Sequence, residues 1–206
     1  MKKEPPLIMV VEDQHAVRQV ICRRLEAEGY RVIGAEHGGK ALEVMRLKKG
    51  EIKAIVLDQE MTEWEGEPPA KKDSAMRDGD EFIKAALEEG HKLPFIIVNS
   101  ASIESFCQWM HDLLGIERKD YMKRVKREGE WSEEIITELE FENEENGLHV
   151  ATVDKTAKGA LDRLVSLLET HGVSVEPKPE DVMQAPAELP EGLNKKHPKK
   201  KGRRKG

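Results

Sequence analysis

The sequence contains a set of polar side chains that each come directly after a short apolar run. Three of them are carboxylates, one is a lysine, and one position offers either an amide or a hydroxyl. Three carboxylates held close together repel one another unless a cation neutralises them, and oxygen ligands with water suit Mg²⁺. A lysine near the same point can assist phosphoryl transfer, because that chemistry depends mainly on positioning and charge neutralisation. The residues are Glu12, Asp13, Asp58, Asn99 with Ser100, and Lys155.

These side chains can meet only if the apolar runs lie side by side as strands. Continuous apolar runs are typical of central parallel strands, whose two faces are both covered by helices. The intervening segments have apolar residues at helical spacing and end at glycines such as Gly29 and Gly90. The expected strands are residues 7–11, 30–35, 54–57, 95–98 and 149–153, and the expected helices are 17–25, 39–48, 82–87 and 161–168.

Alternating strands and helices predict an α/β fold with a parallel sheet that is built from right-handed crossovers. In such a sheet the functional site lies beyond the carboxyl ends of the strands, where the strand order switches. The polar residues listed above all follow strands, so we expect them to gather at that edge.

Two long stretches interrupt this alternation. Residues 62–77 combine glycine, prolines and mixed charges, and are expected to form a loop. Residues 102–148 form a larger insertion before the last strand. Within it, residues 103–114 carry an apolar stripe, and the acidic stretch 131–145 has Ile135, Ile136 and Leu139 at helical spacing, so we expect a helical insertion.

The composition sets the limits of the domain. Charged residues make up 36% of the 206-residue chain, which is rich for a packed domain, so part of the chain should lie outside the core. We expect one domain over residues 1–172 and a disordered, proline-containing and basic tail over residues 173–206. No run of 18 apolar residues occurs, which predicts no membrane span and a cytoplasmic protein.

Taken in order, these motifs resemble the receiver domain of two-component response regulators. The resemblance covers roughly residues 7–170, less the two insertions. It implies a flavodoxin-like, doubly wound, five-stranded parallel sheet with helices on both faces. It also implies a signalling protein that catalyses only its own aspartyl phosphorylation and dephosphorylation. The motifs that carry it are the pair Glu12-Asp13, Asp58 with Met61 three places on, the pair Asp78-Gly79, Ser100 and Lys155.

The resemblance implies how the acidic residues would act. Asp58 would attack phosphorus and become an aspartyl phosphate, with a phosphohistidine on a histidine kinase or phosphotransfer protein as the donor. Asp13 and Asp58 would bind Mg²⁺ together with the backbone carbonyl of Glu60. Glu12 would bind the same ion directly or through water.

The resemblance also implies roles for the remaining residues of the set. Lys155 would pair with a phosphoryl oxygen. Ser100 would hydrogen-bond another phosphoryl oxygen and move when phosphate arrives, although Asn99 remains an alternative for this position. The signal would then pass by contact to an output protein, for which the residues after 172 are too few and too rich in proline and lysine to supply a DNA-binding domain.

Three positions depart from the family pattern. Thr156 follows Lys155 where receivers usually have a proline, often in a cis bond, and a cis bond before a non-proline residue costs about 2.5–4 kcal/mol. The turn there should therefore differ. Thr152 replaces the aromatic residue that usually couples to the hydroxyl residue, and Thr62 replaces a common proline after Met61.

Two alternatives stay open at this stage. The chain could be a degenerate receiver that keeps the fold without accepting phosphate. It could instead be a nucleic-acid-associated binding module that acts through the basic stretch from Lys195 to Lys205, because basic side chains release counterions from nucleic acid. That stretch contains no aromatic residue, so base stacking is not predicted.

Overall fold

The computed structural model describes residues 4–61, 79–101, 122–127, 130–135, 139–143 and 147–175. For residues 122–127 and 130–135 it describes the backbone only. All the described residues lie within one compact unit, residues 1–175. The predicted loop at 62–77, the predicted helix at 103–114 and the basic stretch beyond residue 194 lie outside the described residues.

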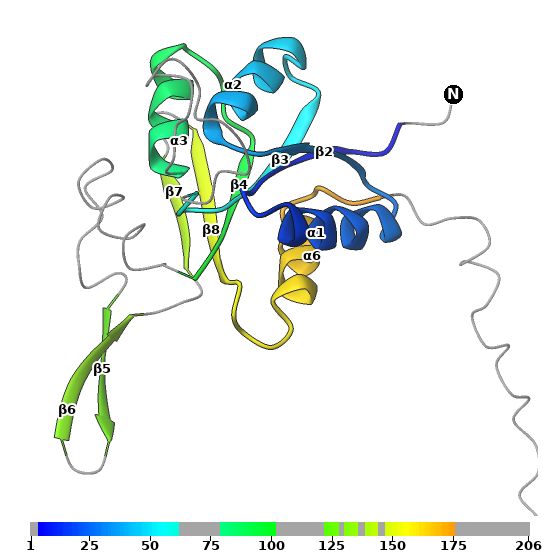
Figure 1. Ribbon diagram of the computed structural model, residues 1–206. Coiled ribbons are helices and arrows are strands. Elements are labelled where there is room, and N and C mark those ends of the chain that lie inside the picture. Colours follow the sequence, from blue (N-terminus) through cyan, green and yellow to red (C-terminus); the bar gives the residue numbers. More distant parts are fainter. Residues whose placement is uncertain are drawn as a thin grey trace, which may run out of the picture. The chain divides into compact units, whose positions relative to one another are not determined.

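All five predicted strands and all four predicted helices are present (Figure 1). The five predicted strands are parallel and lie in the order β2-β1-β3-β4-β8. This is the flavodoxin-like order, in which the second strand lies outside the first. The strands are β1 (Leu7–Val11), β2 (Arg31–Ala35), β3 (Ile52–Leu57), β4 (Phe95–Ser100) and β8 (Leu148–Asp154), and the helices are α1 (His15–Ala27), α2 (Gly38–Leu47), α3 (Gly79–Glu88) and α6 (Ala160–Thr170).

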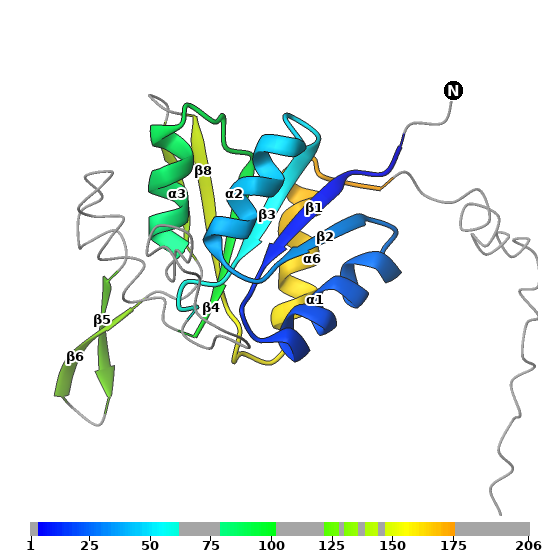
Figure 2. The same cartoon turned by 45° about the horizontal axis from the view of Figure 1, so that its top comes forward.

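The sheet separates two hydrophobic clusters, and alternate residues of each strand contribute to opposite sides. In β1, Met9 and Val11 pack with residues of α2 and α3, whereas Ile8 and Val10 pack with residues of α1 and α6. Figure 2 shows α1 and α6 together on one side of the sheet and α2 and α3 on the other. Burial on both sides explains why β1, β3 and β4 read as continuous apolar runs.

The insertion before β8 is not helical where the structure describes it. Two of its segments, β5 (Met122–Arg127) and β6 (Glu130–Ile135), pair as an antiparallel hairpin. A third, β7 (Glu140–Asn143), joins the main sheet antiparallel to β8, so the sheet has six strands rather than the five predicted (Figure 1). The helical prediction for residues 131–145 was therefore wrong over β6 and β7.

Strand β7 is held to β8 at a residue that departs from the family pattern. The backbone N–H of Leu139 donates to the hydroxyl of Thr152 at 2.9 Å, and the N–H of Thr152 donates to the carbonyl of Leu139 at 2.8 Å. Leu139 and Phe141 then pack into the cluster on the α2 and α3 side of the sheet. The inserted strand thus extends both the sheet and one of its cores.

The described unit extends past the last helix. The hydroxyl of Tyr30 donates to the carbonyl of Val173 at 2.8 Å, and the Val173 side chain is buried with α6. Among the residues that the structure describes, no helix combines the length and the apolar character needed to span a membrane.

Candidate functional site

The predicted polar residues gather at the carboxyl ends of the parallel strands. Glu12 and Asp13 follow β1, Asp58 follows β3, and Lys155 follows β8. Ser100 ends β4 and lies opposite Asp154 of β8, the residue that precedes Lys155. Because β3 lies between β1 and β4, the acceptor candidate Asp58 is flanked on both sides by strands that supply polar residues.

The three carboxylates form one compact, buried cluster. Glu12 and Asp58 are each 1% exposed and Asp13 is 6% exposed. One carboxylate oxygen from each of them lies within 4.8 Å of the others. The backbone N–H of Gln14 donates to Asp13 Oδ1 at 2.8 Å, which fixes this side chain at the start of α1.

Lys155 is the counter-charge of the cluster. Its Nζ donates to Asp58 Oδ2 at 2.5 Å and lies 3.6 Å from Glu12 Oε2. Its side chain is 21% exposed, so the ammonium also lies near the surface. One positive charge faces three carboxylates, and the site retains a negative excess when all three are ionised.

Two oxygens of the cluster have no hydrogen-bond partner among the described residues. They are Glu12 Oε2 and Asp58 Oδ1, and both are buried. Buried polar atoms without a partner are costly and rare in folded proteins. Carboxylate oxygens in this arrangement fit a hard divalent cation such as Mg²⁺, which would satisfy both atoms and offset the remaining negative charge.

The electrostatics of the site affect Glu12 and Lys155 in particular. Burial, and next the negative charge of Asp58, raise the pKa of Glu12 from 4.5 to about 8. Burial alone would lower the pKa of Lys155, but its hydrogen bond to Asp58 and the charges of Asp58 and Glu12 outweigh burial, and the pKa is raised. Lys155 therefore stays protonated while Glu12 holds a proton through neutral pH in the metal-free protein.

Arg18 positions the backbone of the acidic pair, a role that the sequence analysis missed. Its guanidinium, from the first turns of α1, donates to the carbonyl oxygens of Glu12 and Asp13. A Cβ on Gly34 would come within 3.3 Å of the Arg18 side chain, so the glycine leaves room for it. The signal in the sequence is an arginine one helical turn after an acidic pair that ends a strand.

Gly79 has a steric role beside Asp58. A Cβ at Gly79 would lie 2.7 Å from the Asp58 carbonyl oxygen, closer than real Cβ atoms come, and 3.1 Å from Gln59 Oε1. The N–H of Gly79 donates to the carbonyl of Gln59 at 2.9 Å. The loop that follows β3 and carries Asp58 is called the acceptor loop below. The start of α3 can approach it only because residue 79 has no side chain.

The loop after β3 contains Glu60, whose backbone carbonyl is the remaining predicted Mg²⁺ ligand. The side chain of Glu60 is exposed, and this carboxylate is not part of the buried acidic cluster. Its predicted role rests on its backbone carbonyl, two residues beyond Asp58. Met61 is buried at 4% exposure and packs into the cluster on the α2 and α3 side, which anchors the loop.

Both candidates for the hydroxyl position lie at the end of β4. Asn99 is 3% exposed and Ser100 is 1% exposed. Asn99 lies opposite Val153, Ser100 lies opposite Asp154, and the carbonyl of Ser100 accepts from the N–H of Lys155 at 3.2 Å. The Asn99 side-chain oxygen is buried without a hydrogen-bond partner in the described part of the chain. The structure thus keeps both residues next to the turn that carries Lys155.

The turn after Lys155 differs from the family pattern, as the sequence predicted. No peptide bond among the described residues is cis. The Asp154 carboxylate instead accepts from the backbone N–H of Thr156 at 2.9 Å and from its hydroxyl at 2.6 Å. This local side-chain turn directs the chain from β8 towards α6 without a proline.

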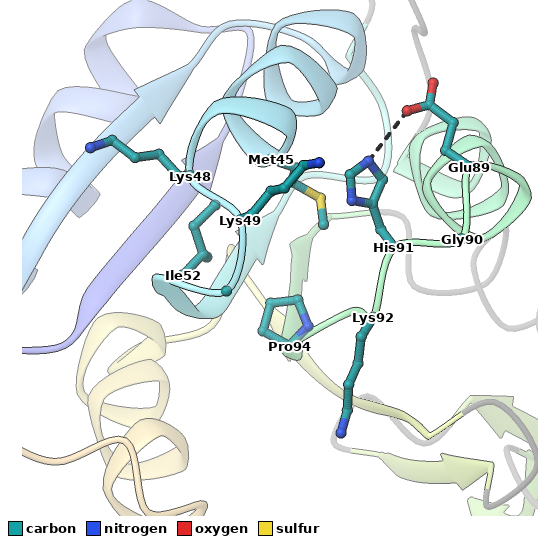
Figure 3. A pocket seen from close by; sticks show the side chains of 10 residues that line it. Met45, Lys48, Lys49, Ile52, Glu89, Gly90, His91, Lys92 and Pro94 are labelled. Atoms are coloured by element: carbon teal, nitrogen blue, oxygen red, sulfur yellow. Dashed lines mark hydrogen bonds and ion pairs between the residues drawn. The ribbon is translucent and has the colours of Figure 1, made fainter.

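A cavity of about 340 Å³ lies elsewhere on the domain. It is lined by residues near the ends of α2 and α3 and at the start of β3, including Lys49 and Pro94 (Figure 3). One of its lining residues, His91, pairs with Glu89 at 3.3 Å. Asp58 follows the opposite end of β3, so this cavity does not form part of the acidic cluster.

No family model and no curated protein sequence matches the chain. Solved structures do match. The receiver domain of the hybrid histidine kinase CckA is 29% identical, over 48% of this chain and 78% of its own, with a TM-score of 0.35. The Vibrio cholerae chemotaxis protein CheY4 is 17% identical, over 81% of this chain and 98% of its own, with a TM-score of 0.48.

A third match is the Thermotoga maritima response regulator TrrA, solved in complex with Mg²⁺ and BeF. It is 26% identical, over 46% of this chain and 69% of its own, with a TM-score of 0.34. The chain has the fold of a receiver domain, and this assignment rests on its strand order and on the helices that cover both faces. The antiparallel strand β7 is an addition to that fold.

Proposed function

We propose that this chain is a phosphoacceptor receiver that takes a phosphoryl group on Asp58 in the presence of Mg²⁺. The observation that carries the proposal is the pairing of Asp58. One of its carboxylate oxygens accepts a hydrogen bond from Lys155, and the other is buried without a hydrogen-bond partner in the described part of the chain. A carboxylate placed in this way has one oxygen for a cation and one for phosphorus.

The proposed transfer is a nucleophilic displacement at phosphorus. An Asp58 oxygen forms a bond to phosphorus while the bond from phosphorus to the donor breaks, and the donor leaves with its electron pair. With a phosphohistidine donor whose second ring nitrogen already carries a proton, the leaving group is the neutral imidazole, and no further proton is needed. Lys155 shifts from Asp58 to an oxygen of the transferred group, so its charge follows the negative charge being moved.

The carboxylates of Glu12, Asp13 and Asp58 fit a Mg²⁺ ion, as the two orphaned oxygens indicate, with the Glu60 carbonyl as a further ligand. The bound ion would neutralise charge on the transferring phosphoryl group. The chain itself supplies the positions. Arg18 holds the backbone of the acidic pair, and Gly79 lets α3 approach the acceptor loop. Ser100, or Asn99 beside it, would donate a hydrogen bond to the phosphoryl group.

We propose a histidine kinase or a phosphotransfer protein as the donor. Thr152 is buried and bonded to Leu139, so the structure has no rotating aromatic ring at that position to transmit the phosphorylated state. A change at the end of β4 would instead reach β7 through its neighbour β8 and the Thr152 contact. We therefore propose that the inserted strand forms part of the output surface for a partner protein.

The direct test is intact-protein mass spectrometry after incubation with Mg²⁺ and acetyl phosphate. The parent should gain one phosphoryl group, and Asp58→Asn should gain none. Asp162→Asn is the matched control, because Asp162 is an exposed aspartate on α6 that pairs with Arg24 outside the acidic cluster. This control should label as the parent does.

Three outcomes would separate the possible roles. Undiminished labelling of Asp58→Asn would remove Asp58 as the acceptor. A parent that binds Mg²⁺ without gaining a phosphoryl group from acetyl phosphate or from a phosphorylated kinase would be a degenerate receiver. Loss of labelling in Asp162→Asn as well would point to a fold defect rather than to the acceptor.

A further inference from the structure

A second cluster of potential metal ligands lies away from the acidic site. Glu140 begins β7, His149 is the second residue of β8, and His171 caps the C-terminus of α6. One possible ligand atom from each lies within 4.8 Å of the others. His149 lies near the start of β8, whereas Lys155 follows the end of that strand, so the two clusters lie at opposite ends of the sheet.

The strand register explains why these three residues meet. Glu140 lies opposite Ala151 and Glu142 lies opposite His149, so Glu140 and His149 project from the same face of the sheet as Ala151. Ala151 packs on the side of α1 and α6. His171 reaches this face because α6 ends there, and its backbone N–H donates to the carbonyl of Leu167 at 3.1 Å.

An aromatic side chain holds the two imidazoles in place. The His149 and His171 ring centroids are 4.4 Å apart, with an interplanar angle of 87°. Phe95 packs on both of them, with centroid distances of 5.0 Å to His149 and 4.1 Å to His171. These contacts restrict both rings without using their nitrogens.

The polar atoms of the cluster are incompletely satisfied. His171 Nε2 is buried and has no hydrogen-bond partner among the described residues. Glu140 Oε2 lies 3.7 Å from it, which is too long for a hydrogen bond. Ligand atoms of a tetrahedral zinc ion lie roughly 3.3–3.5 Å apart, given metal–ligand distances of about 2.0–2.2 Å. The observed separation is close to that of two ligands of one ion.

We propose that Glu140, His149 and His171 bind a divalent transition metal ion of the Zn²⁺ type. Two imidazoles and one carboxylate are a common zinc ligand set, and the nitrogen donors distinguish this site from the oxygen-only cluster that suits Mg²⁺. A cation at the C-terminus of α6 also interacts favourably with the helix dipole. Glu140 is 46% exposed, so water can reach the fourth coordination position.

Such an ion would tie the inserted strand to the core of the domain. It would join β7, β8 and the end of α6, which are three consecutive elements of the chain. Metal binding would therefore stabilise the attachment of β7, because a site formed only in the folded state shifts the equilibrium towards that state.

The test uses the full chain in excess Mg²⁺, which occupies the oxygen site, with Co²⁺ as a spectroscopic probe and Zn²⁺ as competitor. The parent should bind one Co²⁺ with visible absorption bands, and one equivalent of Zn²⁺ should displace it. His149→Gln, His171→Gln and Glu140→Gln should each weaken binding at least tenfold. His91→Gln is the matched control, since His91 also pairs with a glutamate but has no second histidine beside it in the described part of the chain.

A second measurement needs no substitution at the site. Diethyl pyrocarbonate modification, mapped by mass spectrometry, should be slowed by Zn²⁺ at His149 and His171 and unchanged at His91. The proposal is overturned if the parent binds no Co²⁺ in excess Mg²⁺, or if Zn²⁺ protects neither histidine. It is equally overturned if the three ligand variants remain folded by circular dichroism and bind Co²⁺ as the parent does.

Discussion

Lys155 donates a hydrogen bond to the same carboxylate that the proposed reaction phosphorylates. Its Nζ is 2.5 Å from Asp58 Oδ2, and 3.6 Å from Glu12 Oε2. In the metal-free protein the lysine thus offsets part of the negative charge of the buried acidic cluster. During transfer it must release Asp58 and follow the incoming phosphoryl group. Under the proposed function, the same residue would contribute to stability in one state and to phosphoryl transfer in the other.

We expect Lys155→Met to lower the free energy of unfolding without Mg²⁺ by about 2 kcal/mol, because it leaves buried carboxylates without their counter-charge. Mg²⁺ should restore more stability to this variant than to the parent, since the ion replaces the lost positive charge. Labelling by acetyl phosphate should fall strongly. Urea unfolding with and without Mg²⁺ measures the first two effects. Lys158→Met replaces an exposed lysine three residues further on, and should change neither the stability nor its response to Mg²⁺. An equal loss of stability in Lys158→Met would contradict the role of Lys155 as the counter-charge.

We expect Glu12 to make Mg²⁺ binding depend on pH. Its pKa is raised from 4.5 to about 8 by burial and by Asp58, so the folded metal-free protein binds a proton that the unfolded chain has released. The stability that this proton provides is complete below pH 4.5 and is lost as the pH rises through about 8. Mg²⁺ must displace the proton, so its affinity should rise with pH, by up to about tenfold per unit below pH 8.

Titration calorimetry with Mg²⁺ at pH 6, 7 and 8 measures this dependence. Glu12→Gln should flatten it, and should make the metal-free protein more stable than the parent at pH 9, where the parent must bury a charged Glu12. A parent whose Mg²⁺ affinity does not change between pH 6 and 8 would show that Glu12 carries no proton there.

Gly79 cannot accept a side chain unless the loop after β3 or the start of α3 moves. A Cβ would lie 2.7 Å from the Asp58 carbonyl oxygen, which is a backbone atom that cannot rotate away. We expect Gly79→Ala to cost about 1–3 kcal/mol of unfolding free energy and to slow labelling of Asp58. Thermal unfolding and the rate of labelling by acetyl phosphate test this. Unchanged values in both would mean that α3 can shift outwards freely.

Ser100 and Asn99 can be distinguished by their effect on a phosphoryl mimic. We expect Ser100→Ala to weaken beryllofluoride binding by about 1.5–3 kcal/mol, the contribution of one hydrogen bond to a charged group. Asn99→Ala should have the smaller effect on affinity, measured by fluorescence or calorimetry in Mg²⁺. The reverse ranking would assign the role to Asn99.

Much of the fold and site could be predicted because the signals are local and agree with one another. The run Leu7–Val11 is apolar throughout and ends in two acids, which indicates both a buried strand and its polar end. Asp58 and Lys155 could be placed in the same way. The distance between these two side chains could not be predicted, because it depends on the strand order. That order brings residues nearly a hundred positions apart in the sequence into contact.

The inserted strand β7 was missed because two periodicities overlap in its sequence. Ile135, Ile136 and Leu139 have helical spacing, but Leu139 and Phe141 alternate with Glu140 and Glu142. The alternation was the correct signal, since the apolar pair faces the core and the acids face the other way. It extends over only four residues, and what decides between the two patterns is the free edge of β8, which local sequence does not reveal.

That edge leads to the last prediction, which concerns how the phosphorylated state reaches the insertion. Thr152 is buried at 1% exposure, lies opposite Val98 on β4, and bonds to Leu139 through both its hydroxyl and its backbone N–H. A shift at the end of β4 can therefore pass to β8 and on to β7. Hydrogen exchange with and without beryllofluoride should show a change at the amides of residues 139–143.

Thr152→Val should weaken this coupling, because valine keeps the shape of the side chain and removes the acceptor for the Leu139 N–H. We expect a loss of about 1–2 kcal/mol of stability and faster exchange in β7 in both states. The difference caused by beryllofluoride at residues 139–143 should shrink, while binding of beryllofluoride itself is unchanged. If residues 139–143 exchange identically with and without beryllofluoride in the parent, while other faces respond, β7 has a structural role and the signal leaves the domain elsewhere.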